Sequence, residues 1–258
     1  LAMGTALLPV SAAAAQPEPI GRSVPDGIYR LSFRSDLSSC DLSHDYSYSD
    51  TFFSHSALQY DHALALATLG MVTAAGNTAA SDARYWVNGS VGREANIAAA
   101  YETLGFGKAR FFHYDLDTGA AGDWVGYSMA CKTLTDGDTR QTLVALMLRG
   151  SGYGGEWASN FHIGSGSAHT GFVTPVAEVF ASLKAYLQEL SAVGCSGEIK
   201  LWLGGYSRGA IVANLLAAKI GQELPQLRQE NLFAYCFAVP AALTASDRSD
   251  LQQDFDSN

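Results

Sequence analysis

The sequence predicts an α/β protein with a mixed, mostly parallel sheet flanked by helices and an N-terminal, mostly helical region packed on the same core. Two observations carry this prediction. From residue 109 onward, apolar segments of strand length alternate with longer amphipathic segments, which is typical of strands joined by helices. The chain has 258 residues with 48% hydrophobic side chains, enough to cover such a sheet on both faces.

The N-terminal half contains two expected helices. Residues 57–73 carry apolar side chains at helical spacing, and Gly76 and Asn77 follow as stop signals. Residues 93–106 read as a second amphipathic helix that ends at Gly105. Residues 40–56 are polar and aromatic, and they show neither helical nor strand periodicity.

The C-terminal half contains the expected strands. They lie at 109–116, 124–134 and 142–150, with a turn at Asp136 and Gly137 between the last two. A long helix at 175–190, a strand at 199–203, a helix after Ser207 and a strand at 232–239 follow. Because no linker interrupts this half, we divide the chain into segments 1–15, 16–108 and 109–258, the last being the α/β core.

The first 15 residues, LAMGTALLPVSAAAA, resemble the apolar region and cleavage site of a secretory signal peptide, with Ala13 and Ala15 forming the cleavage pattern. A buried N-terminal helix is the alternative. The chain starts at Leu1 without a Met or a basic segment, so we expect this end to be incomplete. No other segment approaches the length of a membrane span, and the prediction is therefore a secreted protein.

Composition narrows the classes of ligand. The net charge is −9 and no basic run occurs, which argues against a nucleic-acid partner. The four cysteines can pair in an exported protein, but sequence cannot choose among three connectivities. Cys236 lies in the apolar run LFAYCFAV and is expected to be a buried thiol. No metal-ligand spacing occurs, so we expect neither a metal nor a cofactor.

A glycine-flanked serine is the main candidate for chemistry. Gly205 to Gly209 read G-x-S-x-G, with an apolar strand before and a helix after, as a nucleophile elbow requires. Gly205 and Gly209 leave room for the sharp turn that holds Ser207, and the helix starting at Arg208 directs N–H groups toward the site. The alternative is that Ser207 is an ordinary N-cap of that helix.

A second element lies upstream, where the strand VALML ends in Arg149, Gly150 and Ser151 before a glycine-rich loop. A serine hydrolase needs a second oxyanion donor at the end of another strand, and Ser151 is placed to offer its N–H and its hydroxyl. A loop of small residues without a chemical role is the alternative. No Gly-Lys-Ser/Thr follows, so the loop is not a phosphate-binding loop.

These segments together resemble the class 3 lipases, the fungal-type family of the α/β-hydrolases, in a secreted bacterial branch. The resemblance covers about residues 142–245 and rests on LRGS, Trp157, HTGF, GGYSRGA and AYCFAVPAA. It implies that Ser207 is the nucleophile and that the N–H groups of Ser151 and Arg208 form the oxyanion hole. It also implies that His169, in the HTGF segment, is a packing residue at a helix start.

The remaining members of the triad are not evident. In this fold Asp and then His follow the serine, but the last histidine is His169. The late acids lie in a polar stretch typical of an exposed loop: Asp247, Asp250, Asp254 and Asp256. Either the triad Asp and His lie beyond residue 258, or the domain is degenerate. The missing initiator Met favours the first explanation, so we expect a chain incomplete at both ends and inactive as this fragment.

The predicted function is a serine carboxylic ester hydrolase of the lipase, phospholipase or esterase type, acting on a lipid or small ester. The sequence does not separate these three, and a peptidase or acyltransferase would share the same nucleophile. YSYSDTFF at 46–53 and GYGGEW at 152–157 are aromatic candidates for the pocket lining. The alternative from another class is a non-catalytic hydrolase-fold module that binds lipid or a partner. The oligomeric state is not indicated.

Overall fold

The computed structural model describes residues 20–33, 42–76, 86–87, 90–91, 93–114, 122–136, 139–151, 154–164, 169–195 and 197–241. Several expectations lie outside these ranges, among them the signal peptide at 1–15, any pairing of Cys40, the turn at Gly137 and the acidic stretch after residue 241. Among the cysteines within them, Cys131, Cys195 and Cys236 are all free thiols, and burial raises the pKa of Cys236 to about 12.

A mixed sheet forms the centre of the molecule, as predicted. Its order is β1-β7-β8-β9-β10, and β6 also pairs with β7. The strands β1/β7, β8/β9 and β9/β10 run parallel, whereas β6/β7 and β7/β8 run antiparallel. The strand bounds are β1 Gly21–Arg22, β6 Gly107–Phe112, β7 Tyr127–Asp136, β8 Thr139–Leu148, β9 Glu198–Tyr206 and β10 Leu232–Phe237.

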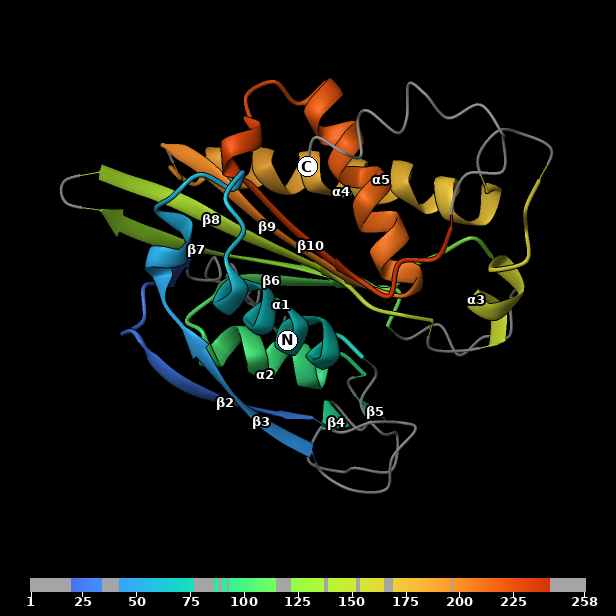
Figure 1. Ribbon diagram of the computed structural model, residues 1–258, viewed down its shortest axis with the longest axis horizontal. Coiled ribbons are helices and arrows are strands. Elements are labelled where there is room, and N and C mark those ends of the chain that lie inside the picture. Colours follow the sequence, from blue (N-terminus) through green and yellow to red (C-terminus); the bar gives the residue numbers. More distant parts are fainter. Residues whose placement is uncertain are drawn as a thin grey trace, which may run out of the picture.

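Helices cover both faces of this sheet (Figure 1). The long helices α4 (Thr170–Ala192) and α5 (Arg208–Glu223) cover one face. The other face carries α1 (His62–Ala74), α2 (Ala95–Thr103) and the hairpin of β2 (Gly27–Phe33) and β3 (Leu42–Tyr48). The short elements are η1 Asp50–Phe53, β4 Trp86–Val87, β5 Ser90–Val91, α3 Gly154–Ser159 and η3 Gln229–Asn231.

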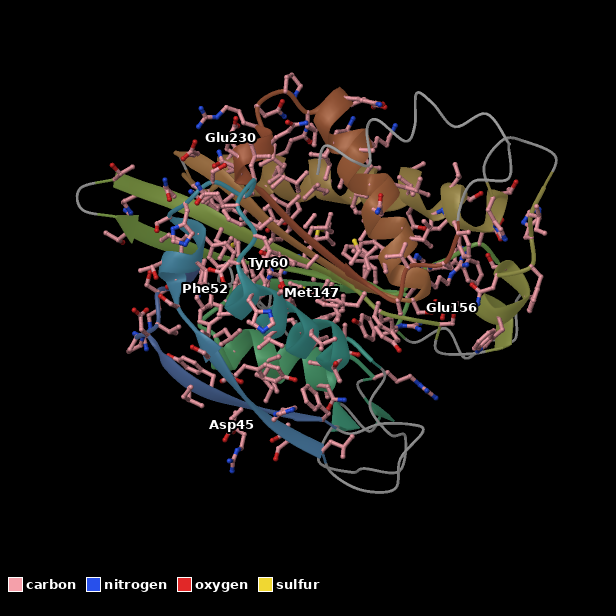
Figure 2. The ribbon with its side chains drawn as sticks, in the orientation of Figure 1. Asp45, Phe52, Tyr60, Met147, Glu156 and Glu230 are labelled. Carbon is pink, nitrogen blue, oxygen red and sulfur yellow. The ribbon has the colours of Figure 1, made fainter. Side chains whose placement is uncertain are left out.

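Two hydrophobic clusters, one on each face, hold the layers together. β8 is buried along its apolar run, with Val144 and Leu146 facing α4 and α5, and Ala145 and Met147 facing α1. Figure 2 shows Met147 between the sheet and the N-terminal layer. A strand that is buried on both faces consists of a continuous apolar run, and for this reason the sequence pattern predicted β8.

The region before residue 109 differs from the expected mostly helical one. Residues 42–48 form strand β3, although their own pattern shows no strand periodicity. The reason is that β3 pairs with β2 along its whole length and stays largely exposed, so the partner strand and not an apolar face specifies it. Helix α1 begins at His62 and not at residue 57, because Asp61 caps it by accepting a hydrogen bond from the Leu64 N–H at 3.0 Å.

A buried lysine attaches the N-terminal layer to the sheet. The Nζ of Lys132, on β7, lies 2.5 Å from Oδ1 of Asp50 and donates to the carbonyl of Leu104 at 2.8 Å. It also lies 4.6 Å from the ring centroids of Tyr48 and Phe106. Burial lowers the pKa of Lys132 to about 8. One side chain of the sheet thus contacts two separate segments of the layer below it, residues 48–50 and 104–106.

Candidate active site

Ser207 lies in a sharp turn between β9 and α5. Its φ of 50° and ψ of −118° fall in a region that side-chain-bearing residues rarely adopt. The turn is held by the Ser207 N–H, which donates to the carbonyl of Phe237 on β10 at 2.9 Å. An ordinary N-cap is extended and its side chain accepts from the helix, but Ser207 has neither property. The geometry is therefore that of an elbow and not of a cap.

The two flanking glycines are required by contacts with backbone. A Cβ on Gly205 would lie 2.4 Å from the carbonyl oxygen of Gly209, and one on Gly209 would lie 2.4 Å from that of Arg149. A third glycine, which sequence reasoning did not single out, has a related role. A Cβ on Gly204 would lie 2.8 Å from the Thr68 side chain and 2.9 Å from the Val72 side chain. Because glycine has no Cβ, α1 can pack closely against β9.

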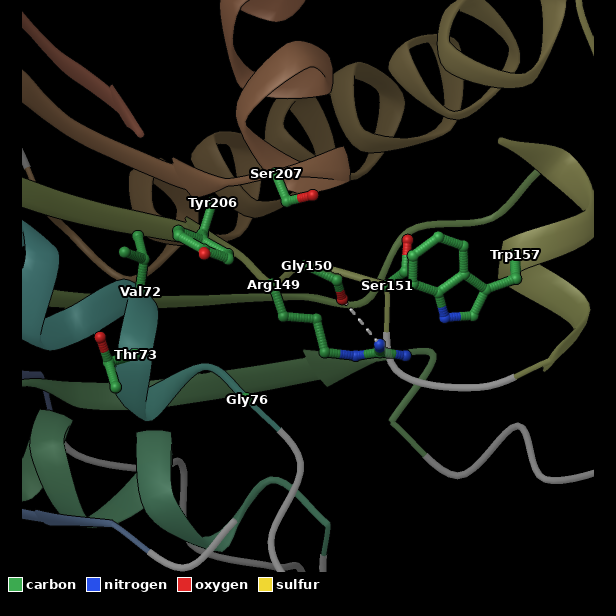
Figure 3. A pocket seen from close by; sticks show the side chains of 9 residues that line it. All are labelled: Val72, Thr73, Gly76, Arg149, Gly150, Ser151, Trp157, Tyr206 and Ser207. Carbon is green, nitrogen blue, oxygen red and sulfur yellow. Dashed lines mark hydrogen bonds between the residues drawn. The ribbon is translucent and has the colours of Figure 1, made fainter. Parts of the chain in front are cut away.

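A cavity of about 460 Å³ opens beside the elbow (Figure 3). Ser207 and Ser151 both line it, so the structure brings these two predicted residues to one site. The walls come from the end of α1, the segment after β8, α3 and the end of β9. The lining residues are Val72, Thr73, Gly76, Arg149, Gly150, Ser151, Trp157, Tyr206 and Ser207.

A chain of hydrogen bonds joins Ser151 to Arg208 through Asn160. The Nδ2 of Asn160 donates to the Oγ of Ser151 at 3.0 Å, and Nη1 of Arg208 donates to the Oδ1 of Asn160 at 3.0 Å. Because the Ser151 oxygen accepts from Asn160, its own proton is available to donate elsewhere. Sequence reasoning missed Asn160, since nothing in its local pattern distinguishes it from an ordinary surface amide.

The side chain of Arg208 connects three segments around the elbow. It is 1% exposed, and its Nε donates to the carbonyl of Trp124 at 2.8 Å. Its Nη2 donates to the Oγ of Ser159 and to the carbonyl of Gly171, both at 2.8 Å. The sequence assigned Arg208 only a backbone N–H at the start of α5. The structure adds a buried guanidinium that fixes the end of α3 and the start of α4 beside α5.

A buried ion pair fixes the segment that carries Ser151. Nη1 of Arg149 lies 2.8 Å from Oε2 of Glu156, and both side chains are at most 1% exposed. The same Nη1 donates to the carbonyl of Gly150 at 3.1 Å, the dashed line of Figure 3, and Nη2 donates to the carbonyl of His113 at 3.0 Å. The charge-assisted bonds of the Arg149 guanidinium therefore hold the turn after β8 to α3 and to the segment of His113.

The histidines have other partners. All six lie in the described ranges, and within them none hydrogen bonds to Ser207. His113 contacts Glu178 at 2.5 Å, and His162 contacts Asp123 at 2.8 Å. His169 is buried, bonds to the carbonyl of Asn160 at 3.0 Å and stacks on Phe172, which matches a packing role. The described part of the chain therefore supplies no histidine base to Ser207.

The aromatic candidates for the pocket lining separate into two groups. Trp157 lines the cavity and is 56% exposed. Tyr48 and Phe53 instead pack in the core against Trp202, so the prediction for the segment 46–53 was wrong. Their polar neighbours hid this burial, because only the tertiary structure brings η1 under the sheet.

Within the described ranges, no three His, Cys, Asp or Glu side chains gather closely enough to hold a metal ion. Nor does any helix in those ranges combine the length and apolarity needed to cross a membrane.

Comparison with known proteins gives one family. Residues 139–255 match the family model described as Lipase (class 3). No curated protein matches the chain. Two solved structures are similar to this chain. One is a fungal lipase–inhibitor complex, at 21% sequence identity and a TM-score of 0.38. The other is a deletion mutant of the Rhizomucor miehei lipase propeptide complex, at 20% sequence identity and a TM-score of 0.43. The alignments cover 51% and 69% of this chain, and 49% and 51% of those chains, so this chain spans about half of their length.

Proposed function

Residues 139–255 match the class 3 lipase family, and on this premise we propose that Ser207 is the nucleophile of a serine ester hydrolase. The observation that carries the proposal is the backbone of Ser207. Its strained elbow faces a cavity that Ser151 also lines, and it is not the geometry of a helix cap. The proposed substrate is a lipid or small ester, and the signal-like residues 1–15 favour a secreted protein.

The proposed reaction proceeds in two steps. Oγ of Ser207 forms a bond to the ester carbonyl carbon while a base takes its proton, and the alcohol leaves as the C–O bond breaks. The oxyanion accepts hydrogen bonds from the N–H groups of Arg208 and Ser151 and from the Ser151 hydroxyl, which Asn160 leaves free to donate. Water then attacks the acyl-enzyme, which releases the acid and restores Ser207.

The mechanism needs a base that the histidines of the described ranges do not supply to Ser207. We propose that the base is a histidine that follows Ser207 and an orienting Asp in the order of the triad. Protein without this base is expected to hydrolyse esters slowly, because the binding and oxyanion interactions then act without proton transfer.

A fluorophosphonate probe tests the nucleophile. In protein expressed from the complete gene, the probe is expected to modify Ser207, as identified by mass spectrometry of the labelled peptide. The Ser207→Ala variant should stay unlabelled at the same concentration. Labelling of a different residue, or equal labelling of the variant, contradicts the assignment.

Asn160→Ala is expected to lower kcat about 10-fold to 100-fold and to leave KM within a factor of two. The reason is that the Ser151 hydroxyl loses the bond that orients it, and oxyanion donors act mainly in the transition state. The measurement is a double-mutant cycle with Ser151→Ala. If the two effects on kcat add fully, Asn160 does not act through Ser151, and this part of the mechanism is wrong.

A second candidate function is a non-catalytic hydrolase-fold module that binds lipid or a partner. The absence of a histidine bonded to Ser207 in the described ranges favours it. Under this alternative, Ser207→Ala keeps the biological activity and the complete protein does not react with the probe. Loss of activity in Ser207→Ala argues for catalysis.

A further inference from the structure

One wall of the cavity comes from a segment that the family match does not include. Val72, Thr73 and Gly76, at the end of α1, line the side opposite Trp157, with Ser207 between the two sides (Figure 3). The match begins at residue 139, well after α1. Family membership therefore does not determine what this wall selects.

The wall is fixed to the strand that carries the nucleophile. Nε1 of Trp202, on β9, donates to Oγ1 of Thr68 on α1 at 2.8 Å. Val72 packs where Gly204 has no side chain, since a Cβ there would lie 2.9 Å from its methyl group. On its other side, α1 meets Tyr46, whose ring would lie 2.8 Å from a Cβ on Gly70. A wall held on both sides cannot withdraw from a ligand, so it discriminates by size.

The surface of the cavity is buried at Val72 and exposed at Trp157. Val72 is 3% exposed, Thr73 beside it is exposed, and Trp157 on the opposite side is 56% exposed. In an acyl-enzyme the acyl group stays on the serine while the alcohol departs and water enters. Departure and entry need an open surface such as that at Trp157, whereas the retained group is suited to the buried surface at Val72.

We propose that the last turn of α1 forms the acyl-chain subsite of this enzyme and that the alcohol leaves past Trp157. The proposal rests on the function proposed above. The wall residues Val72, Thr73 and Gly76 carry no charge, and the Thr73 hydroxyl already donates to the carbonyl of Leu69 at 2.7 Å. Such a surface suits an uncharged aliphatic chain. The cavity of about 460 Å³ must also hold the ester group, so the subsite at the end of α1 takes only part of this volume.

The test fills the subsite with Thr73→Phe and uses Leu66→Phe as a matched control. Both residues are exposed on α1, but Leu66 does not line the cavity. For p-nitrophenyl esters, Thr73→Phe is expected to lower the dodecanoate-to-acetate ratio of kcat/KM by about tenfold or more. Leu66→Phe should leave the ratio unchanged. Val72→Ala removes side-chain volume from the same wall, which enlarges the cavity, and should raise the dodecanoate-to-acetate ratio.

A series of acetates of longer and longer alcohols separates the two sides. Thr73→Phe is expected to leave this series unchanged, whereas Trp157→Ala should alter it. If Thr73→Phe changes the alcohol series and not the acyl series, the two sides are assigned in reverse and the proposal is overturned. An unchanged acyl series in both Thr73→Phe and Val72→Ala overturns it as well.

Binding to the Ser207→Ala protein tests the subsite without turnover. Calorimetry with hexanoate and decanoate is expected to show weaker binding of decanoate when Thr73→Phe is added. If the parent enzyme hydrolyses no ester but this difference appears, the proposed reaction fails and the subsite stands. If the esters are hydrolysed and decanoate binds equally with and without Thr73→Phe, the reaction stands and the subsite fails.

Discussion

In protein expressed from the complete gene, replacing Ser207 by alanine is expected to lower kcat/KM for esters by about 10⁴-fold or more, because the proposed nucleophile is lost while binding and the oxyanion donors remain. Replacing it by glycine should abolish turnover equally but give a more stable protein. The φ of 50° and ψ of −118° cost a residue with a Cβ about 1–3 kcal/mol, whereas glycine adopts them freely.

We expect the free energy of unfolding of Ser207→Gly to exceed that of Ser207→Ala by about 1 kcal/mol, after allowance for the larger unfolded-state entropy of glycine. Urea unfolding of both variants measures the difference, and hydrolysis of p-nitrophenyl esters measures the loss of activity. Equal stability of the two variants would mean that the elbow is not strained. Turnover that survives in both would remove Ser207 from the mechanism.

Gly209→Ala is expected to lower the free energy of unfolding by about 3 kcal/mol and to abolish labelling of Ser207 by a fluorophosphonate. The new Cβ would lie 2.4 Å from the carbonyl oxygen of Arg149 and 2.5 Å from that of Leu148. Both are backbone atoms at the end of a central strand. Neither can move without shifting β8 or α5, and such a shift would also displace Ser151.

Gly221→Ala on the same helix is the matched control. A Cβ at Gly221 meets no atom within 4 Å, so alanine should raise the free energy of unfolding by about 0.5–1 kcal/mol through its better helix propensity. Urea unfolding and probe labelling are measured side by side for both variants. A Gly209→Ala protein that is as stable and as reactive as Gly221→Ala would refute the close contact of α5 with β8.

The strands of the core were predictable because each buried strand consists of a run of apolar residues. The strands 142–150, 199–203 and 232–239 were expected from apolar runs and are found as β8, β9 and β10. Strand β3 was not predictable, because it is specified by pairing with β2 and keeps an exposed, polar face. The aromatic segment 46–53 was misassigned to the pocket for a similar reason, since only the packed layers place Phe53 under Trp202.

Of the candidate site, the sequence alone determined the elbow at Ser207 and pointed to Ser151 as its proposed oxyanion partner. Strand, turn and helix around Ser207 are local, and local chemistry fixes which residues can occupy them. The tertiary structure alone decided that Asn160 joins Ser151 to Arg208 and that the end of α1 forms a cavity wall. These contacts join segments distant along the chain, and no spacing or periodicity encodes them. They depend on how the layers pack: the missing side chain of Gly204 lets α1 approach β9, and the buried ion pair of Arg149 and Glu156 joins the end of β8 to α3.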